Sequence, residues 1–182
     1  MDNEHCPSIT LVIGGARSGK SSYAETLATA TGGNRVYMAT AEPFDDEMRL
    51  RIVRHQKARE GLFFRTVEEP LDLTSALAEV GAESDVVLID CMTVWVGNLL
   101  HHFGLQDSYA HIDTFLAALG DPPTRIVIVT NEVGQGIVPG DPMSRHFRDH
   151  AGWLNQSLAK IADTVVWMVA GIPVVIKGEV RS

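Results

Sequence analysis

The sequence predicts an α/β domain in three layers, with a mostly parallel sheet covered by helices on both faces. Apolar strand-like runs alternate with helix-forming segments along the chain, and several of these runs are apolar without interruption. A length of 182 residues, with 45% hydrophobic and 21% charged residues, suits a single globular domain. We therefore expect one domain over residues 1–182, with a flexible segment over residues 1–8.

The strands are expected where short runs of apolar, mostly β-branched residues are bounded by glycine, proline or charged residues. In chain order these runs cover residues 9–13, 35–41, 63–67, 85–90, 125–130, 164–169 and 174–177. The third run is short and more polar, as in an exposed strand. The last two are joined by residues 170–173, which predicts a C-terminal hairpin.

The helices are expected between these strands, where helix-forming residues are bounded by capping signals. In chain order they cover residues 20–30, 46–59, 71–80, 93–102, 107–119 and 141–162. Gly32 and Gly33 give the first helix a left-handed end, and Gly81 is expected to stop the third. Asp107-Ser108 and Asp141-Pro142 provide starts for the last two helices.

The first strand leads into GGARSGKS, which fits the phosphate-binding pattern G-x-x-x-x-G-K-[ST] residue for residue. Glycines let backbone N–H groups surround a polyphosphate, and the following helix N-terminus adds partial positive charge. We expect Lys20 to reach the β- and γ-phosphates and the Ser21 hydroxyl to bind Mg²⁺. The candidate nucleotide-binding residues are Gly14, Gly15, Ala16, Arg17, Ser18, Gly19, Lys20 and Ser21. A P-loop NTPase domain is therefore predicted, in preference to a glycine-rich turn that binds nothing.

A second Mg²⁺ ligand is expected at Asp90, which ends the apolar run Asp85-VVLI-Asp90 as in the Walker B pattern. Apolar runs that end in aspartate are common. We interpret this one as functional because a P-loop precedes it in the chain. Residues 40–42 and 131–138 also follow strands. Ligands of open α/β sheets bind at the carboxyl ends of the strands, so all these segments are expected at one edge.

The helix expected over residues 46–59 has a cationic face, because Arg51, His55 and Arg59 follow at intervals of four residues. Its buried side is expected to consist of Met48, Ile52 and Val53. Cationic neighbours disfavour the imidazolium, so His55 would keep a lone pair for nucleophilic attack on phosphorus. The arginines could hold a triphosphate or a leaving pyrophosphate. The alternative is a solvated basic face with an incidental histidine.

Four motifs are more specific than a bare P-loop: GGARSGKSSYAE, YMATAEPFDDEMRLRIVRHQ, TNEVGQGIVP and HFRDHAGWLNQSLAKIAD. Together they resemble the adenosylcobinamide kinase/adenosylcobinamide-phosphate guanylyltransferase family of cobalamin biosynthesis, over residues 10–177. The resemblance implies a RecA-like P-loop fold and a homo-oligomer, expected to be a trimer. It also implies two reactions. Adenosylcobinamide is phosphorylated with ATP or GTP, and GMP is then transferred from GTP to that phosphate, releasing pyrophosphate.

The resemblance further implies which residues act. His55, which ends the RI-x-x-H sequence that starts at Arg51, would carry the guanylyl group, and Lys20 would assist catalysis in the P-loop. Further nucleotide contacts are implied at Thr40, Ala41, Glu42, Gln56, Lys57, Ala58, Arg59, Glu68 and Asp90. Arg54 stands where relatives can carry a second histidine, and Gln56 where they can carry a basic residue. Ser21 and Asp90 are the expected metal ligands.

The expected substrates are GTP, ATP, adenosylcobinamide and its phosphate, with Mg²⁺ as cofactor. A formal net charge of −8 without a basic tract argues against a nucleic-acid partner. The N-terminal sequence MDNEHCPS is polar, and no apolar run reaches the length of a membrane span. We therefore expect no stable membrane anchor and a cytoplasmic location.

The motifs assign no role to the cysteines and tryptophans. Cys6 and Cys91 are expected to be free thiols, because two distant cysteines do not make a disulfide framework. Trp95, Trp153 and Trp167 could stack on a corrin ring, although core packing is expected for Trp167.

Three alternatives remain open from the sequence. A single-step P-loop metabolite kinase would use the cationic helix only to clamp its substrate and would form no covalent intermediate. A nucleotide-dependent switch would need no catalysis, but the sequence contains no N-K-x-D motif for guanine. A family member could also retain only the guanylyltransferase step.

Overall fold

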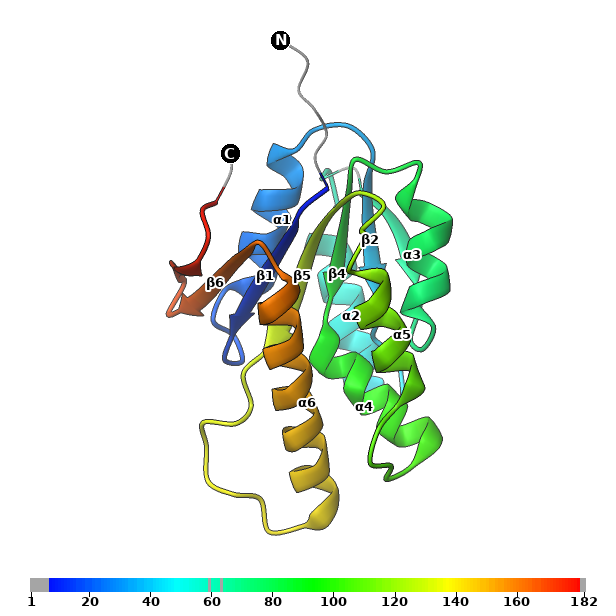
Figure 1. Cartoon of the computed structure of the whole chain (residues 1–182), viewed down its shortest axis with the longest axis vertical. Helices are drawn as coiled ribbons and strands as arrows, with labels where there is room; N and C mark the ends of the chain where they lie inside the picture. The colour runs from blue at the N-terminus through cyan, green and yellow to red at the C-terminus, as the bar shows by residue number, and fades with distance from the viewer. Residues whose placement is uncertain (1–6, 59, 63, 181–182) are drawn as a thin grey trace.

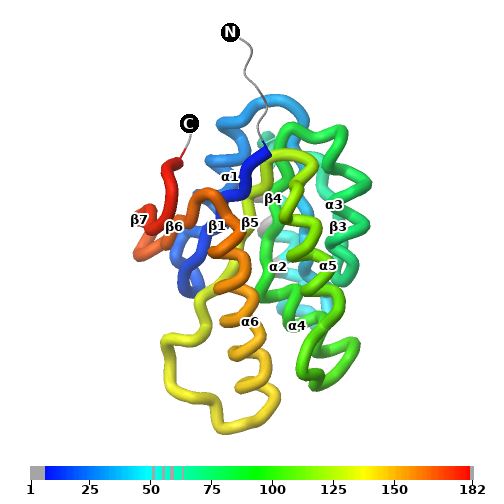
Figure 2. The backbone as a smooth tube through the Cα atoms, in the orientation of Figure 1, coloured from blue at the N-terminus to red at the C-terminus, as the bar shows by residue number. Residues whose placement is uncertain are grey.

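The computed structural model describes residues 7–58, 60–62 and 64–180, except for the side chains of Arg51, His55 and Ala58. Its strands are β1 (Ile9–Gly14), β2 (Arg35–Ala39), β3 (Phe64–Glu68), β4 (Val86–Asp90), β5 (Arg125–Asn131), β6 (Thr164–Val169) and β7 (Ile172–Lys177). They form one sheet in the order β3-β2-β4-β5-β1-β6-β7 (Figure 1; β3 and β7 are labelled in Figure 2). Neighbouring strands are parallel except β6 and β7, which confirms the predicted mostly parallel sheet with a C-terminal hairpin.

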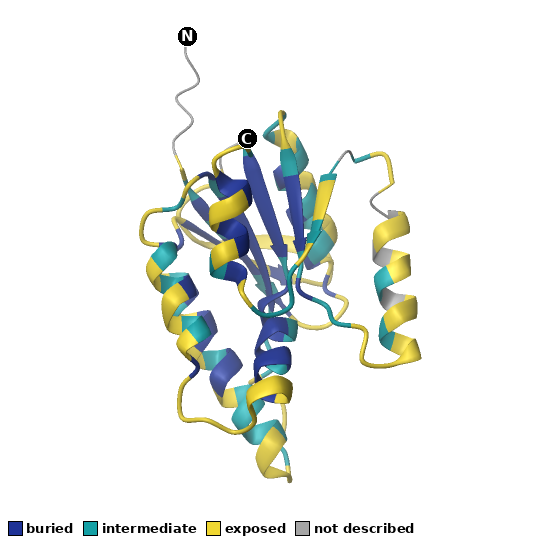
Figure 3. Ribbon diagram, turned by 90° about the vertical axis from the view of Figure 1, so that its right-hand side faces the viewer, coloured by how far each residue is buried: buried dark blue, intermediate teal, exposed yellow. Residues whose placement is uncertain are grey.

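Helices cover both faces of this sheet, which confirms the three layers. They are α1 (Lys20–Ala30), α2 (Asp46–Ala58), α3 (Leu73–Gly81), α4 (Met92–Phe103), α5 (Ala110–Ala118) and α6 (Pro142–Ile161). The helices α3, α4, α5 and α6 lie on one face of the sheet (Figure 2). The buried residues on this face include Trp95, Phe115 and Leu154. On the other face, α1 contributes Ala24 and Ala28 to a second core. Figure 3 shows the buried central strands between these layers.

Several element boundaries differ from the predicted ones, and three of these differences have an explanation in the structure. The helix α3 starts after Asp72, because the Asp72 carboxylate accepts a hydrogen bond from the Ser75 backbone N at 3.1 Å and caps the helix. The helix α5 starts after Tyr109 rather than at Asp107-Ser108, since the Tyr109 hydroxyl is held by the Gly104 carbonyl oxygen at 2.7 Å. Pro173 lies inside β7, which an edge strand tolerates.

Two expectations about burial are wrong. Trp167 was expected in the core, but it is 38% exposed on β6, whereas Trp95 is fully buried. The helix α2 stands to one side of the molecule (Figure 3), and Val53, expected on its buried side, is 45% exposed. Met48 and Ile52 are half-buried. Both differences arise away from the centre of the sheet: β6 is the second strand from one edge, and α2 is linked to β3 at the other edge.

The structure describes part of the expected flexible segment and one of the two cysteines. Residues 1–6 of the expected flexible segment and Cys6 lie outside the described residues, whereas the Ser8 carbonyl oxygen accepts a hydrogen bond from the Ile126 N at 2.8 Å. Cys91 is a buried free thiol, and burial raises its pKa to about 12. Within the described ranges, no helix combines the length and the apolar character needed to cross a membrane.

Candidate nucleotide-binding and active site

The predicted phosphate-binding loop, residues 14–21, connects β1 to α1. Gly19 is the N-cap of α1, with a φ of +91°, and no side chain caps the first turn of this helix. Arg17 also has a positive φ of +57°. The N–H groups at an uncapped helix N-terminus are ready hydrogen-bond donors for phosphate oxygens. The loop therefore has the local structure of an anion-binding site.

Gly14 allows this loop to pack closely on β6. A Cβ at Gly14 would lie 2.7 Å from both the Met168 carbonyl oxygen and the Ser18 hydroxyl oxygen. The Ser18 hydroxyl is buried and makes no hydrogen bond to any described residue, while the Ser18 carbonyl oxygen accepts one from the Gly171 N at 3.0 Å. Buried polar groups normally have a partner. A phosphate oxygen bound in the loop could accept the hydrogen bond that the Ser18 hydroxyl lacks.

Lys20 is buried at the start of α1, with 8% of its surface exposed. Its ammonium group donates a hydrogen bond to the Gly15 carbonyl oxygen at 2.8 Å, so the side chain folds back over the loop. Burial lowers the Lys20 pKa below its ordinary value, and electrostatic interactions with Cys91 and Asp90 act in the opposite direction. A phosphate in the loop would favour the charged ammonium in the same way.

Asp90 lies at the carboxyl end of β4, where its carboxylate accepts a hydrogen bond from the Tyr37 hydroxyl at 2.9 Å. Ser21 lies one residue after Lys20, in the first turn of α1. Mg²⁺ prefers oxygen ligands and takes one or two from the protein beside those of the substrate phosphates. A carboxylate and a hydroxyl flanking the lysine form a donor set that fits this ion.

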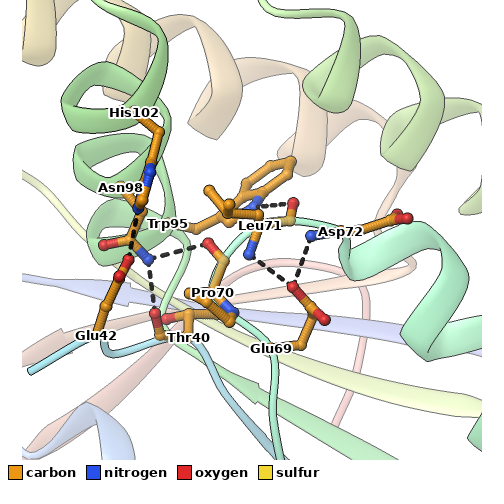
Figure 4. Close-up of polar contacts among 9 residues, drawn as sticks. All are labelled: Thr40, Glu42, Glu69, Pro70, Leu71, Asp72, Trp95, Asn98 and His102. Atoms are coloured by element: carbon orange, nitrogen blue, oxygen red, sulfur yellow. Dashed lines mark hydrogen bonds and ion pairs between the residues drawn. The ribbon is translucent and has the colours of Figure 1, made fainter.

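Thr40 joins the ends of β2 and β4. It is fully buried, and its hydroxyl forms hydrogen bonds with both the backbone N and the carbonyl oxygen of Cys91, each at 2.8 Å. The Asn98 side-chain amide donates to the carbonyl oxygens of Thr40 at 2.7 Å and of Pro70 at 3.0 Å (Figure 4). The hydroxyl and carbonyl groups of this predicted nucleotide contact are thus engaged within the protein.

Ala41 and Glu42 follow Thr40 and are less buried. The Glu42 carboxylate contacts the imidazole of His102, on α4, at 2.8 Å (Figure 4). This contact directs the link after β2 toward α4 rather than toward the P-loop. Ala41 and Glu42 as nucleotide contacts stay predictions.

A buried polar network holds the carboxyl end of β5. The Thr130 hydroxyl donates to the Asn155 side-chain oxygen at 2.7 Å and lies 3.2 Å from the Thr93 hydroxyl. The backbone N of Asn131 donates to the Thr93 hydroxyl at 2.6 Å, and its carbonyl oxygen accepts from the Asn155 amide at 3.0 Å.

No motif in the sequence indicated a role for the buried asparagines of this region, Asn98 and Asn155. Asn98 and Asn155 could have been noticed, because each is a polar residue within the apolar stripe of a helix. Their partners, however, lie far away along the chain. Thr40 is 58 residues from Asn98, and Thr130 is 25 residues from Asn155.

The residues expected around the nucleophile lie on α2 and β3. The Gln56 side-chain amide donates to the Glu68 carboxylate at 3.3 Å, which links α2 to the end of β3, and Lys57 is exposed. Arg59 lies outside the described residues, as do the side chains of His55 and Ala58. Their roles stay predictions.

The strand order separates the expected site residues into two groups. The P-loop follows β1, and β4 and β5 bring Asp90 and Asn131 to the same part of the sheet edge. The strand β3 lies four positions from β1, which corresponds to about 19 Å at the usual strand spacing. The sequence predicted one common edge for the P-loop, residues 40–42, Asp90 and residues 131–138. The α2–β3 group was not part of that prediction, and it lies away from the P-loop.

A glycine-rich phosphate loop, a buried lysine and a carboxylate at the end of a parallel sheet define a P-loop nucleotide-binding protein. The sequence profile of the family described as "Cobinamide kinase / cobinamide phosphate guanyltransferase" matches residues 10–176. The chain therefore belongs to this family.

Individual proteins agree with this assignment. The chain is 43% identical over 169 residues to the bifunctional adenosylcobalamin biosynthesis protein CobP of Pseudomonas aeruginosa, covering 93% of this chain and 97% of that protein. It is 42% identical over 180 residues to the bifunctional adenosylcobalamin biosynthesis protein CobU of Escherichia coli, covering 92% and 98%. Among solved structures, the RadB recombinase matches with a TM-score of 0.50 at 15% identity, covering 88% of this chain and 73% of that chain. This last similarity concerns the fold alone.

Proposed function

We propose that this protein phosphorylates adenosylcobinamide with ATP or GTP and then transfers GMP from GTP to the new phosphate. The products of the second step would be adenosylcobinamide-GDP and pyrophosphate. The observation that carries this proposal is the P-loop itself, with its uncapped helix N-terminus and buried Lys20, in a chain that the family profile matches almost throughout.

In the kinase step, the P-loop residues position the γ-phosphate and stabilise the charge on the transferring group. The N–H groups at the start of α1 and the Ser18 hydroxyl donate hydrogen bonds to phosphate oxygens. Lys20 exchanges its hydrogen bond with the Gly15 carbonyl oxygen for one with the β- and γ-phosphates. Ser21 and Asp90 would hold Mg²⁺, which neutralises phosphate charge when bound.

In the guanylyl step, we assign the nucleophile to His55, in the third turn of α2. A neutral imidazole attacks the α-phosphorus of GTP, pyrophosphate leaves, and the guanylyl group passes from nitrogen to the phosphate of the corrinoid. The support is the RI-x-x-H sequence and the match of the family profile across this segment.

The position of α2 supports the second candidate, a single-step kinase without a covalent intermediate. The strand order places this helix and β3 away from the P-loop strand. A nucleotide held only by the P-loop would then not reach His55, and α2 would serve as a clamp for the corrinoid. The two candidates differ in whether label from the α-phosphate of GTP becomes attached to the protein.

One experiment separates them. The protein is incubated with GTP labelled at the α-phosphorus and Mg²⁺, and we expect bound label that resists alkali and is released by acid, as a phosphorus–nitrogen bond requires. His55→Ala should abolish this label, whereas His101→Ala, which changes an exposed histidine on α4, should not. Absence of label on the wild type, together with phosphoryl transfer from ATP, would favour the single-step kinase.

The same preparations test the P-loop. We expect Lys20→Ala to slow phosphoryl transfer to adenosylcobinamide by about 100-fold or more, because a preorganised cationic donor is lost. The measurement uses γ-labelled ATP and follows labelled corrinoid. Unchanged rates would contradict the role of the P-loop in the kinase step.

The setting in which the protein acts also belongs to this proposal. We infer a homo-oligomer, expected to be a trimer, that works in the cytoplasm without a nucleic-acid partner. The support for assembly is that β7, at the edge of the sheet (Figure 2), is exposed along its whole length and has a mostly apolar sequence.

A further inference from the structure

Glu132 lies directly beside the P-loop. It follows Asn131, the last residue of β5, and its backbone N donates a hydrogen bond to the Gly14 carbonyl oxygen at 3.0 Å. Gly14 is the first residue of the P-loop and pairs with Asn131 in the sheet. The residue is therefore fixed to the part of the sheet edge where the nucleotide phosphates are expected.

The carboxylate of Glu132 is oriented by its own loop. One carboxylate oxygen, Oε1, accepts a hydrogen bond from the Gly134 backbone N at 2.6 Å. A Cβ at Gly134 would lie 3.0 Å from this oxygen, so a residue without a side chain permits the close approach. Among the described residues, none donates a hydrogen bond to the second oxygen, Oε2. The residue is half-buried, so part of its surface is open to a substrate.

The other carboxylates near this edge are engaged elsewhere. Glu42 contacts His102, and Glu69 accepts hydrogen bonds from the backbone N atoms of Leu71 and Asp72 (Figure 4). Asp90 accepts a hydrogen bond from Tyr37 and is the expected metal ligand. Glu132 is thus the carboxylate best placed beside the P-loop to accept a proton.

The backbone before Glu132 is held rigidly. The Asn131 N and carbonyl oxygen are bound by Thr93 and Asn155, which belong to α4 and α6. Two helices and one strand therefore determine where Glu132 leaves the sheet. A general base must lie within hydrogen-bond reach of the proton that it removes, so a rigid attachment serves this purpose.

We propose that Glu132 is the general base of the kinase step. This role rests on the proposed function. The hydroxyl oxygen of the corrinoid side chain attacks the γ-phosphorus of the nucleotide and forms a new oxygen–phosphorus bond. The bond between the γ-phosphorus and the bridging oxygen breaks, and its electron pair stays on the leaving nucleoside diphosphate. The hydroxyl proton passes to the Glu132 carboxylate.

The test compares the two reactions in Glu132→Gln. Glutamine keeps an oxygen that accepts the hydrogen bond from the Gly134 N, so the loop is preserved while the base is removed. We expect kcat for phosphoryl transfer to adenosylcobinamide to fall by about 100- to 10,000-fold. Guanylyl transfer to adenosylcobinamide phosphate supplied ready-made should stay within a few-fold of wild type, because that acceptor needs no deprotonation of a hydroxyl.

The pH profile provides a second readout. In wild type, kcat for the kinase step should fall toward acid as the carboxylate is protonated, and Glu132→Gln should lose this acid limb. Glu132→Asp keeps a carboxylate and should retain the acid limb at a reduced rate. The matched control is Glu79→Gln, which alters an exposed carboxylate on α3 and should leave both reactions unchanged.

Three outcomes would overturn the proposal. Kinase activity of Glu132→Gln within about threefold of wild type would show that the carboxylate is not needed. Equal loss of both reactions would indicate shared nucleotide positioning rather than a base. Absence of phosphoryl transfer in wild type would refute the proposed kinase function and this role with it. Failure of the base role alone would instead leave the wild-type kinase active.

Discussion

Gly14 illustrates how single residues determine the shape of the phosphate site. The neighbours of a Cβ at this position are a backbone carbonyl oxygen on β6 and the Ser18 hydroxyl oxygen, both at 2.7 Å. A backbone atom in a sheet cannot move aside as a flexible side chain can. The P-loop and the last parallel strand therefore fit together only without a side chain at this position.

We expect Gly14→Ala to destabilise the protein by about 1–3 kcal/mol, because the inserted methyl group overpacks the junction of the P-loop and β6. The measurement is the free energy of unfolding in urea. Gly15→Ala is the matched control, since no atom lies within 4 Å of a Cβ there, and its unfolding free energy should be close to that of wild type. Equal stability of both variants would contradict the tight packing at Gly14.

At the scale of elements, capping explains where α3 begins. The Asp72 carboxylate accepts hydrogen bonds from the Ser75 hydroxyl at 2.7 Å and from its backbone N at 3.1 Å. These two bonds lower the Asp72 pKa below its ordinary value. A lowered pKa in the folded state means that the stabilisation is present above the unfolded-state pKa and is lost as pH falls through the folded-state pKa.

We therefore expect Asp72→Ala to cost about 1 kcal/mol of unfolding free energy at pH 7. The difference from wild type should shrink in acid, below the ordinary aspartate pKa of about 3.9, as the wild-type carboxylate becomes protonated. Asp72→Asn keeps a capping oxygen and should lose little stability at pH 7. Urea unfolding at several pH values measures all three proteins, and a pH-independent difference would refute the ionised cap.

Most elements could be predicted from the sequence, because residues that cap or terminate helices and strands mark their ends. Gly32 and Gly33 have positive φ after α1, and Asp141 caps α6, as expected. The start of α5 was wrong because it depends on Tyr109 and its contact with Gly104, which no local capping rule indicates.

The candidate site was only partly predictable, since its residues act through contacts that are distant in sequence. The P-loop and the strand that ends in Asp90 are each recognisable from a short continuous stretch of sequence. The hydrogen bonds of Asn98 with the Thr40 carbonyl oxygen and of Asn155 with the Asn131 carbonyl oxygen depend on how helices pack against the sheet. The separation of α2 from the P-loop follows from the strand order, which alternating patterns along a chain do not specify.

On the scale of the whole molecule, the two outermost strands of the sheet, β3 and β7, differ. The strand β3 is linked to α2 by the bond between Gln56 and Glu68, whereas β7 leaves its outer side open. Ile172 is 65% exposed and Ile176 is 61% exposed on β7. An exposed apolar edge strand is a surface on which a second copy of the chain could pack.

We expect light scattering after size-exclusion chromatography to give three times the 19.8 kDa mass of one chain. Ile176→Lys should shift this mass toward the monomer, because a charge on the edge strand opposes association. Ile137→Lys changes a residue that is 97% exposed in the loop after β5 and should leave the mass unchanged. A monomeric wild type would refute the assembly, and dissociation caused only by Ile137→Lys would place the contact elsewhere.

The direction of β7 has a practical consequence for handling the protein. Because this strand returns antiparallel to β6, Lys177 pairs with Val165 at the edge opposite the P-loop, and Pro7 precedes β1 at that same edge. In Figure 1, the start of β1 lies on the side away from the long loop that follows β5. An affinity tag, a fluorophore or a surface linker attached beyond Pro7 or Lys177 would thus lie away from the P-loop and leave the nucleotide-binding site unobstructed.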